Sequence, residues 1–79
     1  MPIVALIEIQ ADDVSQVREH MEHEDCLAAF YELVGHFNVG VIVEVENEDV
    51  LFDGVVYNIR RIPGVHESRT HLIQDGVVI

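Results

Sequence analysis

Lysine is absent from this 79-residue sequence, and only four arginines offset 15 acidic residues, which gives a formal net charge of −11. Clusters of lysine and arginine bind nucleic-acid phosphates, so the composition disfavours direct nucleic-acid binding. The charge opposes compaction in dilute buffer, whereas molar salt shortens the Debye length to about 3 Å. The absence of lysine therefore favours a halophilic protein from a salt-rich cytoplasm over an ordinary acidic protein.

Cysteine and long apolar runs are equally scarce. Cys26 is the only cysteine, which excludes an intrachain disulfide. No segment is long enough to span a bilayer, and no basic stretch precedes the short apolar run at residues 3–9. The sequence therefore predicts a cytoplasmic protein without a membrane anchor or signal peptide.

Histidine and cysteine do not form a metal motif of high specificity. His20, His23 and Cys26 are three residues apart, but the two histidines fall at a predicted helix end and Cys26 begins a predicted strand. Surface histidines and a small buried thiol are the preferred interpretation. Neither a metal nor another cofactor is predicted.

Apolar periodicity predicts a single domain over residues 1–79. Strands are expected at residues 2–10, 26–34, 39–45 and 65–74, helices at 13–23 and 47–62, and a short terminal strand at 77–79. The order βαββαβ with right-handed crossovers predicts an α+β, ferredoxin-like fold. It has a four-stranded antiparallel sheet, central first and third strands, and two helices on one face.

The second helix is expected to pack through an apolar stripe. The stripe consists of Leu51, Phe52, Val55, Ile59 and Ile62. Gly54 lies within this helix and costs about 1 kcal/mol relative to alanine. A close approach of the helix to the sheet is the expected reason for Gly54.

One side of the predicted sheet has no helix to cover it. Alternation places on that side Val4, Leu6, Ala28, Phe30 and Ile42. Apolar patches of this size usually mark an interface, and a chain this short buries only about 60 per cent of its unfolded surface. These five residues predict a two-fold dimer that packs sheet against sheet.

Three motifs follow one another in a recognisable order. They are the turn Gly35-His36-Phe37-Asn38, the helix exit Ile62-Pro63-Gly64-Val65 and the strand segment Ser68-Arg69-Thr70. With these motifs the chain, over about residues 3–73, resembles the effector-binding (RAM) domain of the Lrp/AsnC, or feast/famine, transcription regulators.

The resemblance implies a stand-alone amino-acid sensing and oligomerisation module in transcription regulation, without enzymatic activity or the helix-turn-helix of full-length members. Domains of this family dimerise through their sheets, assemble into rings and bind amino-acid effectors between dimers. The implied partners are the effector, further copies of the chain and full-length regulators. The implied ligand-binding residues are Gly35, His36, Phe37, Asn38, Ser68 and Thr70.

Two positions depart from the family pattern. Asn38 replaces the usual aspartate, so the carboxylate that could pair with a ligand ammonium is missing. Val34 lies where threonine is common. An Asn38→Asp change is therefore predicted to restore pairing with an ammonium group.

Three other readings stay open. The turn at residues 35–38 also fits a plain hairpin, and the hydroxyls of the last strand fit a solvated edge. An ACT-like regulatory domain has the same element order, but its ligand lies near the first strand–helix loop, which here is acidic and lacks glycine. A small dimeric monooxygenase would use Tyr31, His36 and Asn38. An acyl phosphatase would need an arginine cradle that the four arginines do not form.

Overall fold

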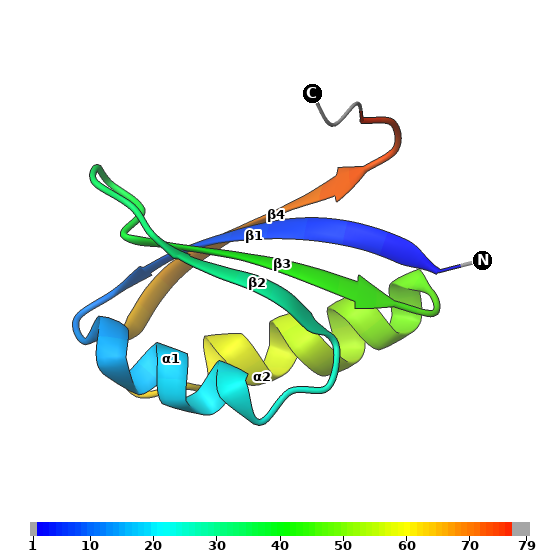
Figure 1. The fold of residues 1–79 in the computed structure, drawn as a ribbon. Helices are drawn as coiled ribbons and strands as arrows, with labels where there is room; N and C mark the ends of the chain where they lie inside the picture. The colour runs from blue at the N-terminus through cyan, green and yellow to red at the C-terminus, as the bar shows by residue number, and fades with distance from the viewer. Residues whose placement is uncertain (1, 77–79) are drawn as a thin grey trace.

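The computed structural model describes residues 2–76, and the strand predicted at residues 77–79 lies outside them. The elements are β1 (Ile3–Ala11), α1 (Val14–Glu22), β2 (Leu27–Glu32), β3 (Val39–Val45), η1 (Val50–Val56), α2 (Tyr57–Arg60) and β4 (Val65–Ile73). η1 continues directly into α2 (Figure 1). The predicted α+β fold and its βαββαβ order are confirmed. Within the described residues, no helix has the length and apolarity needed to cross a membrane.

The strands form one antiparallel sheet in the order β2-β3-β1-β4, and the helices cover one of its faces (Figure 1). β1 and β3 are central, as predicted, and their pairing runs from Ile3 opposite Val45 to Ile9 opposite Val39. Because side chains alternate along a strand, each central strand contributes one face to the core. The face turned away from the helices is called the open face below.

The core lies between the sheet and the helices. Asp13 begins α1, as predicted, by accepting hydrogen bonds from the backbone N–H groups of Ser15 and Gln16. This cap fixes the start of α1, which buries Val17 and Met21. The largest fully buried side chains are Ile7, Ile9, Val17, Met21, Val39, Val41, Val43, Leu51 and Ile59.

A β-bulge in β2 changes which residues face the helices. The register shifts at the exposed Ala28, so Phe30 lies opposite Val41, whose side chain points into the core. Phe30 packs against the core, and the guanidinium carbon of Arg18 lies 5.2 Å from its ring centre. The prediction that Phe30 lies on the open face is wrong, because the bulge reverses the alternation.

The second helical segment begins with the π-helical turns of η1 instead of a regular α-helix. A π-helix bonds residues five apart, and Leu51 and Val56, which have this spacing, are both buried. Phe52 is 44% exposed, so its placement in the apolar stripe is wrong. The wider turn takes Phe52 out of the core and brings Val56 in.

The expected reason for Gly54 is also wrong, because a Cβ added there meets no atom within 4 Å. We expect Gly54→Ala to raise the free energy of unfolding by about 1 kcal/mol, since alanine loses less backbone entropy in a helix. Chemical denaturation measures the change. Gly64→Ala is the matched control: Gly64 has φ +87°, so alanine should destabilise there. Equal effects at both positions would contradict this account.

Candidate functional site

The predicted turn after β2 is present and projects beyond the sheet (Figure 1). The Leu33 N–H donates to the Asn38 carbonyl over 2.9 Å and closes it. Gly35 has φ +141°, where a side chain would be strained. The rings of His36 and Phe37 meet edge to face, with centres 4.9 Å apart. The turn therefore presents two aromatic rings on a defined backbone.

Asn38 has a structural role in this turn. Its side-chain Oδ1 accepts from the Ala11 N–H at 3.0 Å, and its Nδ2 donates to the Ala11 carbonyl at 2.7 Å. Its own backbone N–H donates to the Ile9 carbonyl at 3.0 Å. The carboxamide thus acts like one further residue pair of the β1–β3 ladder. Ala11 therefore fixes both ends of the carboxamide, and the ligand-binding role of Asn38 stays a prediction.

The turn lies beside β4, but it contacts other side chains than those predicted. His36 Nε2 contacts the Glu67 carboxylate. The guanidinium carbon of Arg69 lies 5.3 Å from the centre of the Phe37 ring. Glu67 and Arg69 therefore connect the turn to the open-face side of β4.

Ser68 and Thr70 point to the opposite side of β4. They lie across from Ile9 and Ile7, whose side chains are buried under the helices. Ser68 Oγ accepts a hydrogen bond from Arg60 Nε at 3.0 Å. The predicted ligand-binding residues thus form two groups on either side of β4, and one chain does not bring them into a common pocket.

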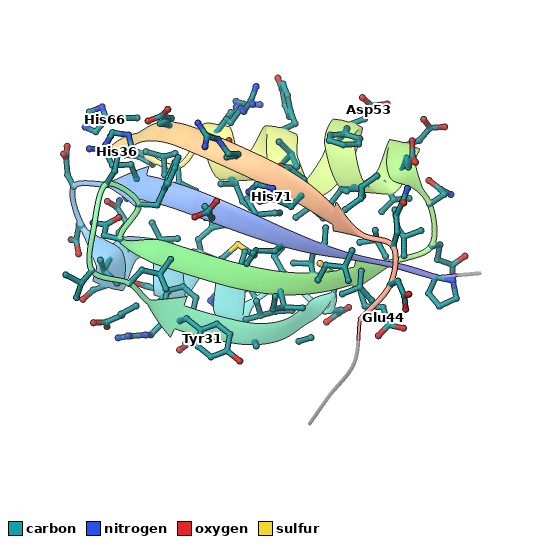
Figure 2. All side chains as sticks on the ribbon, turned by 90° about the horizontal axis from the view of Figure 1, so that it is seen from above. Tyr31, His36, Glu44, Asp53, His66 and His71 are labelled. Atoms are coloured by element: carbon teal, nitrogen blue, oxygen red, sulfur yellow. The ribbon has the colours of Figure 1, made fainter. Side chains whose placement is uncertain are left out.

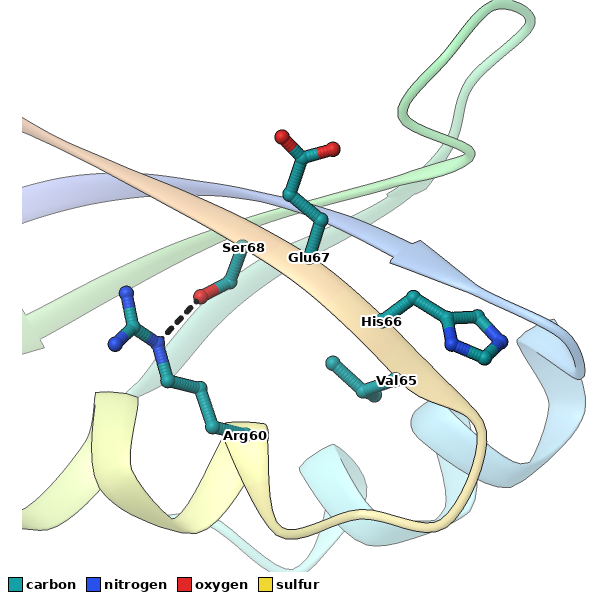
Figure 3. A pocket seen from close by; sticks show the side chains of 5 residues that line it. All are labelled: Arg60, Val65, His66, Glu67 and Ser68. Carbon is teal, nitrogen blue, oxygen red and sulfur yellow. Dashed lines mark hydrogen bonds between the residues drawn. The ribbon is translucent and has the colours of Figure 1, made fainter.

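A cavity of about 330 Å³ lies against β4 near the end of α2 (Figure 3). It is called the edge cavity here, and it is lined by Arg60, Val65, His66, Glu67 and Ser68. Small-molecule sites typically have volumes of about 300–1,000 Å³, so the edge cavity can hold a small metabolite. Of its lining, sequence reasoning identified only Ser68.

Arg60 supplies a permanent positive charge to the lining of the edge cavity. Within residues 2–76, carboxylate oxygens come within 4.0 Å of an arginine only at Arg18, which pairs with Glu32. A guanidinium that lacks a carboxylate in so acidic a chain is available to bind an external anion. From the sequence, Arg60 is only a favourable charge at a helix C-terminus, since nothing in its spacing signals the bond to Ser68.

Two histidines contact carboxylates beside the edge cavity. Asp12 Oδ1 lies 2.8 Å from His66 Nε2, and Glu67 contacts His36. Both histidines lie at the same end of the molecule (Figure 2). Within residues 2–76, no carboxylate oxygen comes within 4.0 Å of Arg60, although Glu67 lines the same cavity.

The open face has an apolar centre and a contact between a histidine and a carboxylate. Val4, Leu6 and Ile42 are half-buried there, and the dimer interface through them stays a prediction. Glu8 Oε1 lies 2.7 Å from His71 Nε2, which joins β1 to β4 across this face (Figure 2). A partner sheet would meet both features.

The residues considered for a reactive thiol, a monooxygenase site or a metal site do not form such a site within residues 2–76. Burial, together with the charge of Glu24, raises the pKa of the Cys26 thiol, which disfavours the reactive thiolate. Tyr31 lies opposite Gly40 on the edge strand β2 and is 55% exposed, while the Asn38 amide is bound to Ala11. The trio that a monooxygenase would need is therefore not formed. Among residues 2–76, no three metal-binding side chains are grouped to hold an ion.

Solved structures of regulatory proteins have the same fold, although no protein-family model and no curated protein sequence matches the chain. E. coli AsnC gives a TM-score of 0.79 at 16% identity, covering 98% of this chain and 54% of AsnC. FFRP-DM1 gives a TM-score of 0.82 at 19% identity, and the match covers 90% of this chain and 97% of FFRP-DM1. The chain has the fold of these feast/famine regulators.

A third structure with this fold contains a ligand. It is a feast or famine regulatory protein from M. tuberculosis complexed with L-methionine, with a TM-score of 0.80 at 22% identity over 98% of this chain and 53% of that protein. The present chain spans about half the length of AsnC and of the M. tuberculosis protein. The fold implied by the family resemblance is confirmed.

Proposed function

We propose that this chain is a regulatory domain of the Lrp/AsnC type that senses a small-molecule effector, acts in transcription regulation and is not an enzyme. The observation that carries the proposal is the edge cavity, in which Arg60 has no carboxylate partner among residues 2–76 and is hydrogen-bonded to Ser68. A protein of the same fold is complexed with L-methionine. Amino acids are therefore the first ligands to test.

The complete site is proposed to form between copies of the chain. Within one chain, β4 separates the turn residues Gly35, His36 and Phe37 from Ser68 and Thr70. The turn projects beyond the sheet and the edge cavity lies on an outer strand, so the turn of one dimer can approach the edge cavity of another. An effector bound there would contact both groups of residues.

Dimerisation is proposed to use the open face, through Val4, Leu6 and Ile42. An effector at the contact between dimers would bind one assembly state more tightly and shift the population toward it. Mixed assembly with a full-length regulator would then transmit the signal. In this mechanism the effector and the copies of the chain are thermodynamically linked partners.

The first strand–helix loop supports this proposal over an ACT-like module. The Asp12 N–H donates to the Gly64 carbonyl at 2.9 Å, and the Asp12 carboxylate is bonded to His66. The loop where an ACT module holds its ligand is thus engaged in contacts with the start of β4. The edge cavity lies beside those contacts.

A thermal-shift screen of the common amino acids tests the proposed function. It should be run in potassium chloride at about 0.1 and about 1 M, because salt screens the self-repulsion of the chain. A ligand at a hundred times its Kd adds about 2.7 kcal/mol of stability, which raises the melting temperature by roughly ten degrees or more. We expect one chemical class of amino acid to give this shift. Uniformly unchanged melting would contradict an amino-acid sensor.

A further inference from the structure

We propose that sheet-to-sheet dimerisation of this chain takes up one proton per copy, which Glu8 and His71 share on the open face. A fall in pH from about 8 to about 6 then strengthens the dimer. This inference rests on the open-face dimer of the proposed function and deepens it, because it names a condition that controls assembly.

Glu8 and His71 contact each other on the open face. Glu8 belongs to the central strand β1 between the buried core residues Ile7 and Ile9, so its side chain points away from the helices. His71 lies on β4 opposite Leu6, which points to the same side (Figure 2). Glu8 Oε1 is 2.7 Å from His71 Nε2, and 28% of the Glu8 side chain and 45% of the His71 side chain are exposed. A partner sheet would remove both groups from water.

His71 is the counter-charge available to Glu8. Among residues 2–76, no other basic nitrogen comes within 4.0 Å of the Glu8 carboxylate. Arg69 lies opposite Glu8 in the ladder, but its guanidinium carbon is 5.3 Å from the centre of the Phe37 ring. The strands and the turn place four further titratable groups on the open-face side, namely Glu44 of β3, Glu67 of β4, His36 of the turn and Tyr31 of β2. With neutral histidines, carboxylates therefore outnumber the single guanidinium on this face.

One proton removes the net charge of the pair. With a neutral His71 the contact carries the charge of Glu8, and a two-fold dimer buries two such charges at one interface, in chains that each have a formal net charge of −11. Salt screens charges less when they are buried, and an ionised carboxylate without a counter-charge is costly to desolvate. A proton between Glu8 and His71 leaves the hydrogen-bonded pair neutral overall. Dimerisation and proton uptake are therefore linked, and each favours the other.

Sedimentation equilibrium of the full chain tests this inference in potassium chloride at about 1 M, which screens the general self-repulsion. Each proton that is taken up changes the dimerisation constant by up to about tenfold per pH unit. We expect the dissociation constant of the dimer to fall at least about tenfold between about pH 8 and about pH 6, where imidazole titrates. A dissociation constant that is equal at both pH values overturns the inference and leaves the dimer of the proposed function intact.

Two histidine variants assign the proton to its site. His71→Gln keeps an N–H donor for Glu8 but cannot take up a proton, so the strengthening of the dimer in acid should be lost. His20→Gln is the matched control, because His20 belongs to α1 on the other side of the sheet and lies 4.0 Å from Glu24 Oε1. The control should keep the full change. Equal losses in the two variants would indicate a general charge effect and overturn the inference.

Glu8→Gln removes the need for the proton. Its uncharged amide can be buried at any pH, so the variant should dimerise at about pH 8 at least as tightly as the parent does at about pH 6. A variant dimer that is weaker than the parent at the higher pH overturns the inference. If the parent is monomeric at both pH values from nanomolar to millimolar concentration, the open-face dimer of the proposed function fails and the inference fails with it.

Discussion

Replacing Asn38 with aspartate should destabilise the protein and should not create a binding group. The Nδ2 of Asn38 donates to the Ala11 carbonyl at 2.7 Å, and a carboxylate oxygen in its place would face that carbonyl without a proton. The unmet hydrogen bond and the repulsion should lower the free energy of unfolding by about 2 kcal/mol. For a domain of this size the melting temperature should fall by about 8–16 °C.

The destabilisation of Asn38→Asp should depend on pH, because it should be present at neutral pH and lost in acid. Only the protonated carboxyl can donate to Ala11, so its folded-state pKa should lie above the unfolded value of about 3.9. The loss of stability is therefore complete above the folded pKa and disappears as pH falls below the unfolded pKa. Denaturation curves for the variant and the parent protein should converge as the pH is lowered from 7 to about 4.

Asn47→Asp is the matched control for this prediction. Asn47 Oδ1 only accepts a hydrogen bond, from the Val50 N–H at 2.9 Å, and aspartate serves equally well as such a helix cap. The control should keep the parent stability at pH 7. If Asn38→Asp is as stable as Asn47→Asp at pH 7 and binds amino acids more tightly, then Asn38 is a ligand residue and the structural role assigned to it is wrong.

Replacing Ile42 with aspartate should convert the proposed dimer into a folded monomer. Ile42 lies on β3 in the middle of the open face and is half-buried in the isolated chain, so a carboxylate there stays partly hydrated in the monomer. In a sheet-to-sheet dimer the same carboxylate would be buried without a partner. Light scattering in about 1 M potassium chloride should give twice 8.9 kDa for the parent and 8.9 kDa for the variant.

Phe30→Asp separates the interface from the core. Because Phe30 packs against the core on the helix side, its replacement should lower the unfolding free energy and should not release a stable monomer. Circular dichroism distinguishes these two results. A folded monomer from Phe30→Asp together with an unchanged dimer from Ile42→Asp would show that β2 forms the interface and the open face does not.

The central strands could be predicted from the sequence because their apolar alternation is compatible with only one register. Val39, Val41, Val43 and Val45 alternate, and a slip of one residue would expose all four to solvent. β2 is apolar on both faces, so its pattern is compatible with either register and does not show the bulge at Ala28. The sequence does not show the π-helical turns of η1 either, because packing on the sheet determines their hydrogen-bonding pattern.

The candidate site was predicted only in part because its bonds join distant residues. Asn38 and Ala11 are 27 positions apart, and no local signal shows that the amide completes a strand pair. Arg60 and Ser68 belong to α2 and β4, and the crossover that joins these elements determines their contact. The family resemblance implied Ser68 as a candidate, but the direction of the Arg60 side chain becomes known only from the folded chain.

An amide NMR titration with L-methionine tests most directly the claim that the edge cavity is the effector site. The account predicts saturable shifts that are largest at Arg60 and residues 65–68, and that are lost in Arg60→Gln but kept in Arg61→Gln. Shifts that are largest at residues 10–13 would instead support the ACT-like reading. The absence of any saturable shift would contradict the edge cavity as a carboxylate site.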